Sequence, residues 1–157
     1  METAVITALV AGIASIASAL VAVVVKDVLE RRSLKPIFGE RRKALTGYWK
    51  GTIEQPNLTA DLTVHLVASH KEVNGIADLR FPFHGKDHHL VLSLKGGFLY
   101  ERFLKLDYKK DNEGVIQFGS LIIEFAEDSE TLKGKYSGYG SLTKSIVSGE
   151  ILLSRSR

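Results

Sequence analysis

The chain has 157 residues, no cysteine and a formal net charge of +3 at neutral pH. The lack of cysteine excludes disulfides, thiolate zinc sites and a cysteine nucleophile, and it fits a reducing cytoplasm. From Leu45 onward, fourteen Lys and Arg balance fourteen Asp and Glu. The basic footprint of a nucleic-acid-binding protein is therefore missing, and we expect no DNA or long RNA as a partner.

The first feature along the chain is an uncharged stretch over residues 4–25. Its 22 residues, at about 1.5 Å of rise each, match the ~30 Å hydrocarbon core of a bilayer. The stretch predicts one transmembrane helix within a segment of residues 1–34. A signal peptide cleaved near residues 17–19 and a buried soluble helix are the alternatives, but no basic residue precedes the apolar run as a signal peptide requires.

Basic residues flank this stretch on one side only. Because Lys and Arg are retained on the cytoplasmic side of a membrane helix, we expect a single-pass protein whose C-terminal domain is cytoplasmic. The same residues can contact anionic lipid headgroups or form a solvated face, and residues 35–44 are interpreted as a basic linker. The basic residues are Lys26, Arg31, Arg32, Lys35, Arg41, Arg42 and Lys43.

The predicted membrane helix is rich in small residues at every fourth position. Such rows let helix backbones approach closely in lipid, where packing drives association. This pattern predicts a homo-oligomer in the bilayer. The residues that we assign to the helix contact are Ala8, Ala11, Gly12, Ser15 and Ala19.

Residues 45–157 alternate apolar and polar side chains with a period of two, which is typical of half-buried strands. In residues 58–67, for example, Leu58, Ala60, Leu62, Val64 and Leu66 share one face. Strands are predicted over residues 46–55, 58–68, 72–80, 88–95, 98–108, 114–126, 130–140 and 145–154.

Eight such strands with short connections predict an all-β fold, an antiparallel up-and-down, lipocalin-like barrel. A closed barrel leaves no exposed sheet edge and can hold one small ligand. A two-sheet sandwich is the competing architecture. No segment after residue 45 has a helical period, so that a nucleotide-binding βαβ unit is not expected.

Four side chains are candidates for contacting a ligand in the barrel. If Leu104 and Leu106 face inward, the alternation places Tyr100 and Arg102 on the same inner face. A buried guanidinium needs a carboxylate or an anionic ligand, so Arg102 either binds a ligand or pairs with an acidic residue such as Glu124 or Glu150.

The other two candidates are aromatic. Tyr136 shares a face with Leu132 and three glycines (Gly134, Gly138 and Gly140), where it can stack on a ligand or serve as a core residue. Trp49 can provide a stacking surface. With Gly47, however, it forms a Gly-x-Trp arrangement that resembles the opening of lipocalin-like barrels, and this resemblance implies that Trp49 closes the barrel.

Catalytic and metal-binding patterns are missing. Five histidines include three within residues 84–89, but a segment between strands lacks the rigid scaffold of a metal site, and we interpret it as a solvated loop. Glu54, Glu124 and Glu150 alternate outward. We expect no enzyme activity, no metal and no cofactor.

Three short segments suggest a family. They are LTGYWKGTI with Gly47 and Trp49, GKYSGYG at 134–140 and SGEILLSR at 148–155. Together with the apolar N-terminus, they resemble the membrane-anchored β-barrel effectors of bacterial CBASS anti-phage defence, although those effectors usually carry two membrane helices.

The resemblance implies a location in the bacterial inner membrane and a barrel that binds a cyclic di- or oligonucleotide. Binding would promote assembly of the transmembrane helices, which then disrupt the lipid bilayer. The alternatives are an effector that answers another defence signal, a membrane-tethered carrier of a lipid or small apolar ligand, and a non-enzymatic interaction module.

Overall fold

A computed structural model describes residues 34–55, 58–100, 102–110, 116–125 and 130–156. The predicted membrane helix over residues 4–25, with Ala8, Ala11, Gly12, Ser15 and Ala19, lies outside the described residues. Within the described ranges, no helix combines the length and the apolar character needed to cross a membrane.

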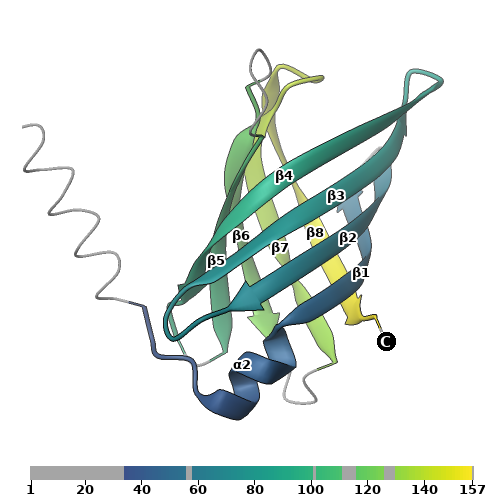
Figure 1. Ribbon diagram of the computed structural model, residues 1–157. Coiled ribbons are helices and arrows are strands. Elements are labelled where there is room, and N and C mark those ends of the chain that lie inside the picture. Colours follow the sequence, from purple (N-terminus) through teal and green to yellow (C-terminus); the bar gives the residue numbers. More distant parts are fainter. Residues whose placement is uncertain (1–33, 56–57, 101, 111–115, 126–129, 157) are drawn as a thin grey trace, which may run out of the picture. The chain divides into compact units, whose positions relative to one another are not determined.

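The described residues form a short helix and a closed antiparallel barrel, in which each strand pairs with its neighbour in sequence and β1 pairs with β8 (Figure 1). This confirms the predicted all-β, eight-stranded, up-and-down barrel and excludes the sandwich. The elements are α2 (Gly39–Leu45), β1 (Gly47–Gln55), β2 (Leu58–Ala68), β3 (Val73–Phe83), β4 (Lys86–Phe98), β5 (Phe103–Lys109), β6 (Phe118–Phe125), β7 (Thr131–Gly140) and β8 (Ser145–Arg155).

Strand alternation decides which side chains fill the barrel. In β2, Ala60, Leu62, Val64 and Leu66 are buried, whereas Thr59 and Asp61 are exposed. The other strands follow the same rule, because successive side chains of a strand point to opposite faces. The core is therefore the inside of the barrel, built mainly from leucines.

Several predicted strand boundaries differ from those observed, and two of these differences change the interpretation of a segment. The strand predicted over residues 98–108 is interrupted, because β4 continues to Phe98 and β5 begins only at Phe103. The solvated loop predicted around residues 84–89 is reduced to a turn of His84 and Gly85, since Phe83 pairs directly with Lys86. Both turn residues have positive φ angles, 50° and 72°, which match the twist of a two-residue hairpin.

One end of the barrel is closed by α2 and the residues before it (Figure 1). The segment predicted as a basic linker is ordered here, since the Ile37 amide donates to the His70 carbonyl at 2.7 Å and Ile37 is buried. Trp49 is fully buried, and its indole Nε1 donates to the Leu45 carbonyl at 2.9 Å. The tryptophan therefore closes this end of the barrel together with α2.

An arginine of the last strand fixes the helix in place. The Arg155 guanidinium donates to the carbonyls of Ala44 and Thr46, the latter at 3.0 Å, and lies 5.5 Å from the centre of the Trp49 ring. The last carbonyls of a helix have no partner within the helix. Arg155 thus joins the C-terminal end of α2 to β8 and covers the tryptophan.

Candidate ligand-binding cavity

The barrel encloses a cavity of about 490 Å³ at the end opposite α2. Residues from the ends of several strands surround its mouth, among them Gln55 of β1, His84 of the β3–β4 turn and Thr143 of the β7–β8 connection. The volume lies within the ~300–1,000 Å³ range of small-molecule sites. The barrel is therefore hollow at one end and filled at the other.

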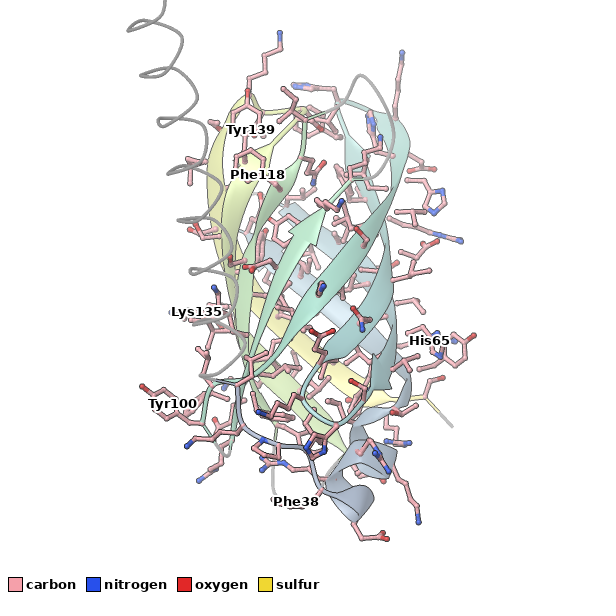
Figure 2. The ribbon with its side chains drawn as sticks, turned by 60° about the vertical axis from the view of Figure 1, so that its left-hand side comes forward. Phe38, His65, Tyr100, Phe118, Lys135 and Tyr139 are labelled. Carbon is pink, nitrogen blue, oxygen red and sulfur yellow. The ribbon has the colours of Figure 1, made fainter. Side chains whose placement is uncertain are left out.

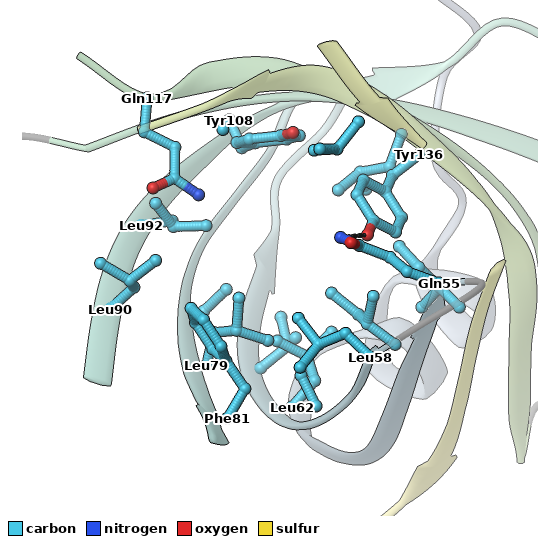
Figure 3. A pocket seen from close by; sticks show the side chains of 18 of the residues that line it. Gln55, Leu58, Leu62, Leu79, Phe81, Leu90, Leu92, Tyr108, Gln117 and Tyr136 are labelled. Atoms are coloured by element: carbon cyan, nitrogen blue, oxygen red, sulfur yellow. Dashed lines mark hydrogen bonds between the residues drawn. The ribbon is translucent and has the colours of Figure 1, made fainter. Parts of the chain in front are cut away.

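The wall contributed by β2, β3 and β4 is apolar (Figure 3). No Asp, Glu, Lys or Arg belongs to the described residues that line the cavity. A charged group placed against this wall would lose its hydration without gaining a partner, which is unfavourable. The apolar side chains of this wall that Figure 3 labels are Leu58, Leu62, Leu79, Phe81, Leu90 and Leu92.

The wall on the other side carries four uncharged polar side chains, Gln55, Tyr108, Gln117 and Tyr136 (Figure 3). The Gln55 amide nitrogen donates to the Tyr136 hydroxyl, and the Ser141 hydroxyl donates to Gln117 Oε1 at 3.1 Å. These bonds fix two amides at the edge of the cavity. The cavity is therefore amphipathic but uncharged.

Glycines in β6, β7 and β8 provide the space for the two tyrosines. Gly119 pairs with Gly138, and a methyl group on either would overlap the Tyr108 hydroxyl and the backbone of the neighbouring strand. At Gly149, a methyl group would lie 2.8 Å from the Tyr136 ring. Because glycine has no side chain, both rings lie close to the wall, and the centre of the cavity stays open.

Both tyrosines are held in the neutral form. Burial, and secondarily the nearby Tyr136, raises the pKa of Tyr108 to about 12. Burial also raises the pKa of Tyr136, although the hydrogen bond from Gln55 acts in the opposite direction. At physiological pH, both side chains are therefore phenols that can donate a hydrogen bond.

The raised pKa of Tyr108 predicts a loss of stability in alkali. Folded Tyr108 holds its proton more tightly than the unfolded residue, whose pKa is 10.0. The stabilisation is therefore fully present below pH 10.0 and lost as the pH rises through about 12. We expect the free energy of unfolding to fall less steeply between pH 10.0 and about 12 in Tyr108→Phe than in the wild type.

Urea unfolding at several pH values measures this difference. Tyr139→Phe is the control, because Tyr139 lies on the outer face and stacks on Phe118 with 6.2 Å between the ring centres (Figure 2). If the free energy of unfolding fell equally steeply with pH in the wild type and in Tyr108→Phe, the raised pKa would not belong to Tyr108.

The four predicted ligand-contacting residues are separated in the structure. Tyr136 lines the cavity, which confirms its predicted inward direction. Trp49 is at the closed end and does not belong to the lining. Tyr108, Gln55 and Gln117 were not predicted, although Tyr108 follows the same alternation as Leu104 and Leu106.

The predicted inward direction of Tyr100 and Arg102 is wrong. The Tyr100 side chain is 68% exposed, and Figure 2 shows it pointing away from the barrel. Arg102 has a side chain that is 54% exposed and forms an ion pair with Glu124 at 2.6 Å. Both residues lie in the connection between β4 and β5, where the alternation of a strand no longer applies.

The histidines of residues 84–89 are dispersed. His84 lies in the turn, His88 stacks on Phe81 with 5.7 Å between ring centres, and His89 contacts Asp78 at 2.6 Å. The hydrogen bond with His89 is the largest cause of the lowered pKa of Asp78. No group of three or more potential metal ligands occurs among the residues described.

Comparisons with protein-family models, with curated proteins and with solved structures give no match for this chain. The class of protein is consequently defined by the fold and the site. It is a closed, eight-stranded, up-and-down barrel with an uncharged, largely apolar internal cavity.

Proposed function

We propose that this protein is a membrane-tethered binding protein that holds a small, largely apolar and uncharged molecule inside its barrel, without catalysing a reaction. The observation that carries the proposal is the cavity of about 490 Å³, which is lined mainly by apolar side chains, with four uncharged polar side chains on one wall and further polar residues of the β3–β4 and β7–β8 connections at its mouth. Burial of apolar ligand surface contributes roughly 25 cal/mol per Å², whereas a buried charge would have no partner there.

The N-terminal sequence supports a tether in the lipid bilayer. Residues 4–25 are uncharged and long enough to span, and basic residues follow them. In this proposal the barrel is cytoplasmic and the small-residue rows favour a homo-oligomer. A bilayer also concentrates apolar molecules, so that it is a natural source of such a ligand.

A cyclic di- or oligonucleotide is the second candidate ligand, and with it a role as an anti-phage membrane effector. Two tyrosines and two glutamines on one wall could stack on nucleobases and form hydrogen bonds with them. The phosphates would then lie at the mouth, where Lys86 and Lys144 are exposed beside the β3–β4 and β7–β8 connections. The uncharged lining favours the apolar ligand over this one.

One preparation of the full-length chain tests both candidates. The protein is purified from bacterial membranes, and molecules released on denaturation are identified by mass spectrometry. Separately, the protein is titrated with a panel of cyclic di- and trinucleotides. We expect a neutral amphipathic molecule in the extract and no saturable nucleotide binding. Tight nucleotide binding would instead establish the second candidate, and a failure of both would favour an interaction module.

A further inference from the structure

The Tyr108 hydroxyl is a polar group inside the barrel without a hydrogen-bond partner among the described residues. The residue is only 6% exposed, and its hydroxyl lies over the Gly119–Gly138 pair. A phenol hydroxyl can donate a hydrogen bond and accept others, so this group is available to a molecule inside the barrel.

The hydroxyl is accessible from the cavity. Among the described residues, every side-chain oxygen or nitrogen that is fully buried has a hydrogen-bond partner. The Tyr108 hydroxyl has no hydrogen-bond partner there, so it is not fully buried. Because Tyr108 lines the cavity, its hydroxyl must border the open space. A ligand in the cavity can therefore reach this oxygen.

Neighbouring groups on the same wall also have donors available. The Tyr136 hydroxyl accepts a bond from the Gln55 amide, which leaves its own proton for another acceptor. Gln117 Oε1 accepts from Ser141, which leaves the amide N–H groups. The polar wall thus presents hydrogen-bond donors to the cavity, beside acceptors such as Gln55 Oε1, while the lining side chains of β2–β4 are apolar.

We propose that the ligand carries an uncharged acceptor oxygen, such as a carbonyl, and that Tyr108 donates a hydrogen bond to it. This inference rests on the proposed binding of an apolar molecule, and it adds that the molecule carries one polar group, the acceptor oxygen. The apolar body of the ligand lies against the leucines of β2–β4, and the acceptor oxygen lies against the tyrosines. Tyr108 then selects among apolar molecules of the same size.

The test compares a ligand that has the acceptor with one that lacks it. Methyl hexyl ketone and its hydrocarbon isostere, in which a methylene group replaces the oxygen, are titrated by calorimetry into the full-length chain in lipid nanodiscs. Empty nanodiscs are subtracted. The proteins are the wild type, Tyr108→Phe and, as the matched control, Tyr139→Phe on the outer face.

We expect Tyr108→Phe to weaken ketone binding by about 3- to 10-fold, as for one neutral hydrogen bond, and to leave binding of the isostere unchanged. An equal loss for both ligands, or no loss for either, would overturn the role of Tyr108 while apolar binding stands. If the wild type binds neither ligand saturably, the proposed function itself fails, and this inference fails with it.

Discussion

Trp49→Ala should destabilise the barrel by about 3–5 kcal/mol, the usual cost of removing a fully buried aromatic side chain. The indole is completely buried, contacts Phe125 edge to face at 6.2 Å and bonds to the Leu45 carbonyl. Its loss would leave an empty space at the closed end and remove the surface on which Arg155 lies. Urea or thermal unfolding of the full-length chain measures the change.

Two further variants separate the causes of this loss. Trp49→Phe keeps a buried ring but lacks the indole N–H, so it should be destabilised less than Trp49→Ala. Tyr48→Ala changes the preceding, exposed aromatic residue and should cost well under half as much, as surface substitutions do. If Trp49→Ala were no more destabilising than Tyr48→Ala, Trp49 would not be what closes the barrel.

Leu92→Trp should weaken binding of an apolar ligand by at least about tenfold, equivalent to 1.4 kcal/mol or more. Leu92 points from β4 into the cavity (Figure 3), and an indole in its place would occupy the space that the ligand needs. In a filled core, a larger side chain costs ~1–3 kcal/mol. The empty volume beside Leu92 should reduce that cost, so the barrel should remain folded.

Val91→Trp is the matched control for this substitution. Val91 precedes Leu92 in β4, but its side chain is 47% exposed on the outer face. The same indole there should leave binding of methyl hexyl ketone unchanged. Circular dichroism verifies that both variants fold. Unaltered ketone binding in folded Leu92→Trp would place the ligand somewhere other than the cavity.

The closed end of the barrel is also where the described chain begins. Leu34 to Phe38 lead directly into α2, and the Lys35 amide donates to the Phe98 carbonyl at 2.7 Å. The cavity opens at the opposite end of the barrel. A ligand could therefore enter and leave without displacing α2, Trp49 or Arg155.

The sequence alone determined the number of strands and, for most of them, which side chains point into the barrel. Alternation with a period of two is a local property, so β2 could be predicted at its observed bounds of residues 58–68. The same signal was ambiguous in residues 98–108, because charged and apolar side chains are mixed on both faces. The break between Phe98 and Phe103 was missed there, and Arg102 was assigned to the inside.

Only the tertiary structure decided which inward residues face open space and which fill the core. Gln55 and Tyr136 are separated by 81 positions in sequence, and they meet because closing the barrel brings β1 and β7 to either side of β8. Trp49 and Tyr136 both point inward, yet one closes an end and the other lines a cavity. Strand period specifies the direction of a side chain, but its depth in the barrel depends on the register of all the strands.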